Sequence, residues 1–285
     1  MNIHKNRLLR KIILPIFSKV NPGNIFINHH YTGDRMLLHS FRHRGYWYHG
    51  REREKNTMLL FKKLINKGDT VIEVGGHIGY ISLYFSNLVG KKGVVYVFEP
   101  GINNLPYLKN NVKEKHNIVV IEKGVGNSNA RMPFYIENLT GQNNSFIKDF
   151  GDFKRNKKNS FVNASVDEVT VDVVRLDDFI FDKKISPNFI KIDVEGFEFE
   201  VIKGMSYILK NYKPILMIEV ENNINNKIEY KSIKGIYNFM VNEKYIIFND
   251  NLKLIKSYNE LSGNNFFVHS KKHISILNTL GIDIS

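Results

Sequence analysis

Two acidic residues and a glycine-rich turn in the first half of the chain have the spacing of a nucleoside-binding site. Glu73 lies in the run Val71-Ile72-Glu73-Val74-Gly75-Gly76-His77-Ile78-Gly79, and Glu99 follows the apolar run 94–98. In doubly wound α/β sheets the glycine turn lets a ligand approach the main chain, and the acid after the next strand binds the ribose hydroxyls. The pattern predicts a nucleoside cofactor at the ends of these two strands.

Dinucleotides and S-adenosylmethionine are both bound in this way, and the residue types favour the second. A dinucleotide site has glycine where this turn has His77, whose side chain would crowd the pyrophosphate, and Glu73 would repel the same group. A carboxylate suits the ammonium and sulfonium groups of S-adenosylmethionine, and free amides at the start of the following helix suit its carboxylate. The candidate cofactor-binding residues are Glu73, Gly75, Gly76, His77, Gly79, Glu99, Val125 and Asp193.

A second group of charged residues occurs in the run Ile190-Lys191-Ile192-Asp193-Val194-Glu195-Gly196. Alternation along a strand places Lys191, Asp193 and Glu195 on one face, although Glu195 lies at the turn that follows. At the carboxyl end of a parallel strand these side chains would lie in the crevice where open α/β sheets bind ligands. The structural alternative is an ion pair, or an acid that caps the following helix.

A regular alternation of strands and helices surrounds these residues and predicts a doubly wound, parallel core. From apolar periodicity we expect helices at 57–67, 80–89, 103–116, 198–209 and 228–241. We expect core strands at 71–74, 94–99, 118–122, 189–194 and 215–220, and an antiparallel excursion with strands at 131–137 and 169–176. The polar segment 138–165 carries the basic run 154–158 and is expected to be a loop. Strands at 245–248, 252–255 and 266–269 suit an antiparallel edge.

The first 56 residues are expected to precede the main domain at 57–285 as a basic helix over 1–20 and an aromatic- and histidine-rich cap over 21–56. The apolar stretch 12–17 is short, contains Pro15 and is followed by Lys19, so it does not fit a signal peptide. No segment approaches the roughly eighteen apolar residues of a membrane span. We expect a cytoplasmic protein whose residues 1–20 are a candidate contact with an anionic inner membrane surface.

Composition narrows the function classes further. The chain has 285 residues, a net charge of +13 and no cysteine. The lack of cysteine excludes disulfides, cysteine–zinc sites and thiolate nucleophiles, including the attack on pyrimidine carbon that proceeds through a cysteine adduct. The charge has three explanations: a bias toward lysine, an anionic or membrane-carried substrate, or RNA. RNA is least favoured, because no run of arginine interleaved with aromatic residues marks a nucleic-acid surface.

Several of these motifs together resemble the FkbM family of S-adenosylmethionine-dependent methyltransferases. The resemblance covers residues 69–222 and rests on Glu73–Gly79, Phe98-Glu99-Pro100, Lys191–Gly196, Lys203-Gly204 and Pro214…Glu219. It implies a class I methyltransferase fold, which is α/β and Rossmann-like. Such a fold has a mostly parallel seven-stranded sheet, helices on both faces and an antiparallel carboxyl-terminal edge, here with an N-terminal helical and aromatic cap.

The resemblance also implies roles for single residues. Glu73, Gly75 and Gly79 would hold the methionine end of the cofactor, and Glu99 would bind the ribose. The family usually has aspartate at position 73 and asparagine at position 77, so the chain departs from the family at Glu73 and His77. The acceptor in this family is usually a hydroxyl of a sugar, a polyketide or another secondary metabolite.

Methyl transfer to a hydroxyl is an in-line displacement, so alignment of the reactants supplies much of the acceleration. A carboxylate within hydrogen-bond reach of the hydroxyl can act as general base. Asp193 is the first candidate for this base and Glu195 the second, with Lys191 orienting one of them or binding an acidic acceptor. A magnesium ion held by Asp193 and Glu219 is a less favoured alternative.

Three functions remain, in order of preference. The first is an O-methyltransferase acting on a sugar of a surface glycan or glycolipid, or on a secondary metabolite. The second is an RNA methyltransferase, although Val194-Glu195-Gly196 stands after Asp193 where enzymes that methylate base amines have a Pro-Pro-aromatic sequence. The third is an NAD-dependent oxidoreductase.

Overall fold

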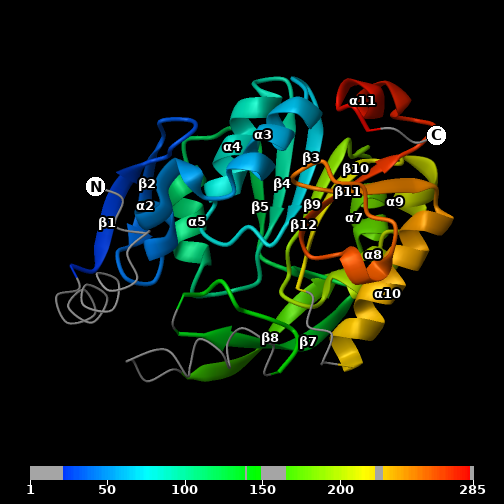
Figure 1. The fold of residues 1–285 in the computed structure, drawn as a ribbon. Coiled ribbons are helices and arrows are strands. Elements are labelled where there is room, and N and C mark those ends of the chain that lie inside the picture. The colour runs from blue at the N-terminus through cyan, green and yellow to red at the C-terminus, as the bar shows by residue number, and fades with distance from the viewer. Residues whose placement is uncertain (1–21, 139, 149–164, 222–226, 283–285) are drawn as a thin grey trace, which may run out of the picture.

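A seven-stranded sheet forms the centre of the protein (Figure 1). The computed structural model describes residues 22–138, 140–148, 165–221 and 227–282, without the side chains of 227–230. The strand order is β11-β12-β10-β9-β3-β4-β5. The five neighbouring strands β10, β9, β3, β4 and β5 run parallel to one another. Strand β12 is antiparallel to both of its neighbours. The strands are β3 (Thr70–Val74), β4 (Val94–Phe98), β5 (Ile118–Ile121), β9 (Phe189–Ile192), β10 (Ile215–Val220), β11 (Tyr245–Asn249) and β12 (Gly263–His269). The predicted mostly parallel sheet with an antiparallel carboxyl-terminal edge is confirmed.

Helices cover both faces of this sheet, because successive residues of its buried strands point to opposite sides. Val71 belongs to the core under α3, α4 and α5, whereas Ile72 belongs to the core under α7, α8, α9 and α10. The helices are α3 (Lys55–Leu64), α4 (Tyr80–Val89), α5 (Leu105–Val112), α7 (Leu176–Lys183), α8 (Glu198–Lys203), α9 (Ser206–Asn211), α10 (Lys227–Asn242) and α11 (Ile274–Thr279). None of the helices in the described part of the chain is long and apolar enough to cross a membrane.

The cap before the sheet contains an antiparallel hairpin, which the sequence analysis did not predict. Strands β1 (Asn24–Asn28) and β2 (Arg35–His39) pair with each other, and α2 (Arg44–His49) and a 3₁₀ turn at Gly50–Glu52 follow. The cap lies beside α5 (Figure 1), where the Asn111 side chain exchanges two hydrogen bonds with the Leu37 main chain, at 2.7 and 2.9 Å.

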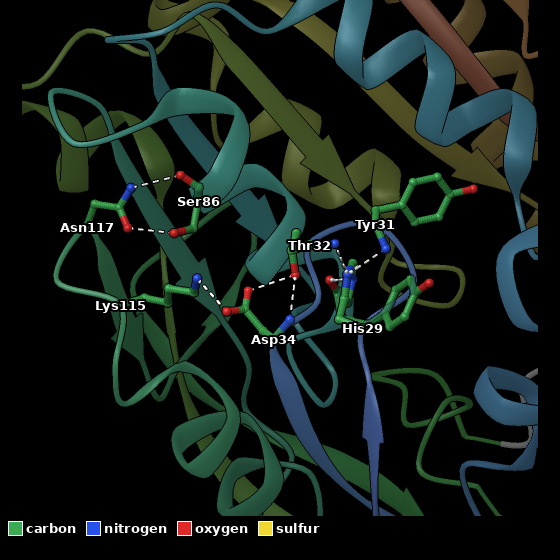
Figure 2. A network of polar contacts seen from close by, with 8 residues as sticks. His29, Tyr31, Thr32, Asp34, Ser86, Lys115 and Asn117 are labelled. Atoms are coloured by element: carbon green, nitrogen blue, oxygen red, sulfur yellow. Dashed lines mark hydrogen bonds and ion pairs between the residues drawn. The ribbon is translucent and has the colours of Figure 1, made fainter.

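A polar network fixes the hairpin turn to the core (Figure 2). His29 Nδ1 accepts from the amides of Tyr31 and Thr32 at 3.2 and 3.1 Å. The other ring nitrogen, Nε2, therefore donates to the Tyr80 carbonyl oxygen at 3.0 Å. Asp34 on the same turn forms an ion pair with Lys115 at 2.8 Å. The cap is thereby attached to the start of α4 and to the loop after α5.

A separate three-stranded sheet forms the predicted excursion, beyond one end of the main sheet (Figure 1). Its strands are β6 (Gly124–Val125), β7 (Ala130–Glu137) and β8 (Val166–Val174), in the order β6-β8-β7. The predicted antiparallel pairing of β7 with β8 is confirmed. The predicted basic run 154–158 and the predicted basic helix 1–20 lie outside the described residues.

Some predicted elements are wrong. The helix expected over 198–209 is two helices, because the Asp177 carboxylate accepts from the amides of Tyr207 and Ile208 and so begins α9 as a new helix. The expected strand 252–255 is only a single bridge between Leu254 and Phe248. The segment after β8 turns at once into α7, and the chain ends with α11; neither helix was predicted.

Candidate active site

The glycine turn after β3 is held tightly against the ends of two neighbouring strands. Gly75 has φ +87°, and a Cβ atom there would lie 1.9 Å from the Asp193 carbonyl oxygen, so only glycine fits. At Gly76 a Cβ atom would lie 2.3 Å from Val97 Cγ1. The amides of Gly75 and Gly76 both donate to the Phe98 carbonyl oxygen, at 3.0 and 3.1 Å. The turn is therefore fixed to β4 and to the segment that follows β9.

Glu73 is buried in the sheet directly before this turn. In the register of β3 and β9 it lies opposite Lys191, and its carboxylate accepts from the Ser82 hydroxyl at 2.6 Å. Burial raises the pKa of Glu73 to about 7, although Lys191 and Ser82 act in the opposite direction. A positively charged ligand nearby would favour the ionised form.

Glu99, just after β4, is fixed by three hydrogen bonds. Its carboxylate accepts from the His77 amide at 2.7 Å, the Gly101 amide at 2.9 Å and the Asn104 side-chain amide at 3.2 Å. Burial nevertheless raises the pKa of Glu99 to about 7. Asn104 Oδ1 is buried without a hydrogen-bond partner among the described residues.

Lys191 and Asp193 form an ion pair at the end of β9. Lys191 Nζ lies 2.9 Å from Asp193 Oδ2 and donates to the Gly75 carbonyl oxygen at 3.3 Å. Burial alone would lower the pKa of Lys191, but Asp193 and Glu73 outweigh it and hold this pKa above its usual value. The ion pair expected as the structural alternative is thus present, and it lies beside the glycine turn.

Glu195 lies in the turn before α8, and Glu198 is the first residue of that helix. Glu195 has φ +52°, and its carbonyl oxygen accepts from the Ser145 hydroxyl at 2.7 Å. Burial and then the charge of Asp193 raise the pKa of Glu195 well above its usual range. The carboxylate of Glu198, and not that of Glu195, accepts from the Gly196 amide at 2.9 Å. Phe197 occupies the N-cap position of α8 and makes no side-chain capping hydrogen bond, so the alternative expectation of an acid that caps this helix is wrong.

A cavity of about 400 Å³ connects these residues, within the size range of small-molecule sites. The main sheet contributes Glu73, Gly75, Gly76, His77, Glu99, Lys191, Asp193, Glu195 and Glu219 to its lining. The β6 residue Val125 and the segment 140–144 add to it. Of the predicted site residues, Gly79 does not line the cavity; a Cβ atom there would lie 2.9 Å from Leu108 Cδ1, in the packing of α4 on α5.

The cap closes one side of this cavity through α2 and the residues after it. The Tyr46 hydroxyl lies 3.0 Å from His77 Nδ1, and the guanidinium of Arg53 lies 4.7 Å over the Tyr46 ring. Burial lowers the pKa of His77 to about 3, so its ring is neutral at physiological pH. The ring of His77 therefore binds the cap, while its main-chain amide binds Glu99.

Magnesium was a less favoured expectation at Asp193 and Glu219. Across the described ranges, no three His, Cys, Asp or Glu side chains are grouped so that they could hold a metal ion. Lys191 already pairs with Asp193, and the charge of Asp193 together with burial raises the pKa of Glu219 well above its usual range.

Arg53, Asn104 and Asn144 are among the cavity-lining residues that were not predicted as site residues from the sequence. Asn104 lies five residues after Glu99, at the start of α5. This short separation from a predicted ribose-binding acid could have marked Asn104 as a neighbour of the same site. Arg53 reaches the cavity only because the cap docks against the sheet edge, and no local pattern marks it.

The family to which the chain belongs follows from a match over more than half of its length. The model described as the methyltransferase FkbM domain matches residues 73–247. The chain belongs to the FkbM methyltransferase family. This match begins at Glu73 and includes the glycine turn, Glu99 and the Lys191–Asp193 pair, so the resemblance drawn from the sequence is confirmed. The matched residues begin after the cap.

The chain is similar to one curated protein and to solved structures at low sequence identity. "Methyltransferase 1" of Beauveria bassiana (strain ARSEF 2860) is 26% identical over 147 residues, which is 47% of this chain and 57% of that protein. The chain thus spans little more than half of this curated relative. The structure of methyltransferase FkbM from Methylobacillus flagellatus KT is similar over 70% of this chain and 43% of its own, with 19% identity and a TM-score of 0.45. Aeropyrum pernix fibrillarin, solved with natively bound S-adenosyl-L-methionine, covers 86% of this chain and 93% of its own, with 12% identity and a TM-score of 0.41.

Proposed function

We propose that this FkbM-family protein transfers the methyl group of S-adenosylmethionine to a hydroxyl group. The acceptor that we propose is a sugar of a surface glycan or glycolipid, or a secondary metabolite. One observation carries the proposal: Glu73, Glu99 and the Lys191–Asp193 pair all line one cavity. This arrangement supports a donor site and a candidate base that act on the same small molecule.

The residues present fit the cofactor. A carboxylate has about four acceptor positions, and Glu99 uses three of them, which leaves one for a ribose hydroxyl. Asn104 Oδ1, which none of the described residues satisfies, is a second acceptor beside Glu99. The raised pKa values of Glu73 and Glu99, both about 7, indicate acids whose ionised forms a cation would stabilise. When bound, S-adenosylmethionine supplies an electrophilic methyl group on a positively charged sulfur.

Asp193 is the general base in this proposal. Its carboxylate would accept the proton of the acceptor hydroxyl, and the methyl group that the cofactor would supply would pass from sulfur to the hydroxyl oxygen and leave S-adenosylhomocysteine. Lys191 holds Asp193 in place through the 2.9 Å ion pair. Glu195 is less suited to accept this proton, because the raised pKa keeps its carboxyl protonated to higher pH.

A polyhydroxylated acceptor agrees with the side of the cavity that faces Asp193. Carboxyl groups of Glu195 and Glu219 can accept from or donate to neighbouring hydroxyls, and the ring of Tyr48 also lines the cavity.

Calorimetry tests the cofactor part of the proposal directly. S-adenosylmethionine and S-adenosylhomocysteine should bind and NAD should not. Binding of NAD alone would instead support an oxidoreductase. Formation of S-adenosylhomocysteine in the presence of a panel of neutral and acidic sugars then tests the acceptor class, with RNA as the comparison substrate.

A further inference from the structure

Arg53 brings a permanent positive charge from the cap into the cavity. Its side chain is 25% exposed, and the guanidinium is stacked over Tyr46 at 4.7 Å. Tyr46 in turn contacts His77 of the glycine turn. The Arg53 side chain is therefore fixed in place beside the proposed donor site.

The end of the Arg53 side chain has unused hydrogen-bonding capacity. An arginine has five N–H donors. The Arg53 contact with an acid among the described residues is the one from Nε to Glu54, at 3.3 Å. No described residue accepts a hydrogen bond from either terminal nitrogen, Nη1 or Nη2. Stacking on Tyr46 leaves the edge of the guanidinium plane accessible for a bidentate contact through two parallel hydrogen bonds.

The missing side chain of Gly45 leaves space for the guanidinium of Arg53. A Cβ atom on Gly45 would lie 2.7 Å from Arg53 Nη1. Gly45 lies within α2, where alanine would be the better helix former. A larger residue at position 45 would displace the guanidinium, so glycine preserves the position of Nη1.

Apart from Glu54, the acids that line the cavity with Arg53 are not bound to it within the described residues. Asp193 is paired with Lys191, and within the described residues neither Asp193 nor Glu219 forms an ion pair with Arg53. Burial would lower the pKa of Arg53, but Tyr46, Glu54, Glu219 and Asp193 together hold it above its usual value. The guanidinium therefore stays charged and close to the proposed base.

We propose that Nη1 and Nη2 of Arg53 bind an oxyanion on the acceptor, either a carboxylate or a phosphate. The acceptor is then an acidic or phosphorylated sugar or metabolite, and Arg53 is a specificity-determining residue. This inference rests on the proposed function, because it assigns the acceptor of that same site. A guanidinium binds a carboxylate or a phosphate through two parallel hydrogen bonds, and a neutral sugar offers no such partner.

The test measures binding of glucose, glucuronate, glucose 6-phosphate and inorganic phosphate to the full chain saturated with S-adenosylhomocysteine. We expect an anionic probe to bind at least about tenfold more tightly than glucose. Glucuronate and glucose 6-phosphate distinguish a carboxylate from a phosphate. Arg53→Gln should remove this preference. Arg53→Lys should keep only part of it, because lysine keeps the positive charge but lacks the two parallel N–H donors of the guanidinium.

Gly45→Ala provides a variant that keeps the charge of Arg53 and moves only its end, so it should also weaken the preference. Arg35→Gln is the matched control, because Arg35 is stacked over Phe26 at 3.9 Å and does not line the cavity. Equal binding of the anions to wild type and Arg53→Gln, or no preference over glucose in wild type, overturns the inference. If wild type binds no S-adenosylhomocysteine, the proposed function itself fails.

Discussion

Glu73 makes the stability of the protein depend on pH. Its pKa is about 7 in the folded protein, because of burial, whereas an unfolded glutamate titrates near about 4.3. A raised pKa means that the folded state binds the proton more tightly. The contribution of Glu73 to stability is therefore fully present below about pH 4 and is lost as the pH rises through about 7.

We expect the melting temperature of the ligand-free protein to fall between about pH 5 and about pH 8. Glu73→Gln should reduce the accompanying loss of unfolding free energy by about 2–3 kcal/mol, because glutamine does not ionise and can still bind Ser82. Thermal unfolding of wild type and variant over this range checks the expectation. Parallel curves for the two proteins would contradict it.

Asp193→Asn should separate turnover from cofactor binding. Loss of a general base lowers the rate by about 10²–10⁴-fold, while S-adenosylhomocysteine should bind with nearly unchanged affinity. Steady-state rates and calorimetry on the same preparation measure both. Asp178→Asn is the matched control, since Asp178 is on α7 in an ion pair with Arg175 and does not line the cavity. Full activity of Asp193→Asn would exclude it as the base.

The residues at strand ends could be placed from sequence, and those from the cap could not. Glu73, Glu99 and Asp193 each follow an apolar run, and parallel strands bring their carboxyl ends to one edge. Arg53 and Tyr46 reach that edge only through the docking of the cap. This docking depends on contacts such as His29 with Tyr80, separated by 51 residues, and no local periodicity encodes such a contact.

At the scale of an element, the turn between β3 and α4 is expected to tolerate no side chain at Gly75. Gly75→Ala combines a left-handed φ of +87° with a Cβ atom 1.9 Å from the Asp193 carbonyl oxygen. Gly33→Ala is a matched control, because Gly33 has φ +77° with nothing within 4 Å of the added atom. Urea unfolding should show a loss of about 1 kcal/mol for Gly33→Ala and about 1–3 kcal/mol more for Gly75→Ala.

Gly75→Ala should also lose binding of S-adenosylhomocysteine, which Gly33→Ala should keep. Equal destabilisation of the two variants would mean that, in solution, the Asp193 carbonyl oxygen lies far enough from Gly75 to leave room for a Cβ atom.

Elements with a strong local pattern were predicted well, and elements decided by distant partners were not. The predicted helix 80–89 matches α4, and the predicted strand 215–220 matches β10. Both are apolar runs, which the two cores bury. The break between α8 and α9 depends instead on Asp177, about thirty residues earlier in the chain. The hairpin β1–β2 is short and only partly buried, so its alternation is a weak signal.

At the scale of the whole molecule, the net charge of +13 predicts attraction to anionic surfaces. We propose that residues 1–20 contribute to this attraction, because they include the basic residues Lys5, Arg7, Arg10, Lys11 and Lys19. Each basic residue near an anionic bilayer is worth about 1 kcal/mol. Cosedimentation with anionic vesicles should be stronger for the full chain than for a variant without residues 1–20. Equal partitioning of the two, with neutral vesicles as the reference, would rule this contribution out.

The wall that α2 and Arg53 add to the cavity has an evolutionary consequence. Its residues precede position 73, where the family match starts, so its sequence can change without changing a residue of the glycine turn or Glu99, and Tyr46 is its contact with the turn, through His77. We therefore expect homologues to vary in the acceptor that they methylate while they keep the residues proposed to bind the donor. Grafting residues 22–54 between two such homologues should exchange their substrate preference without altering their affinity for S-adenosylhomocysteine.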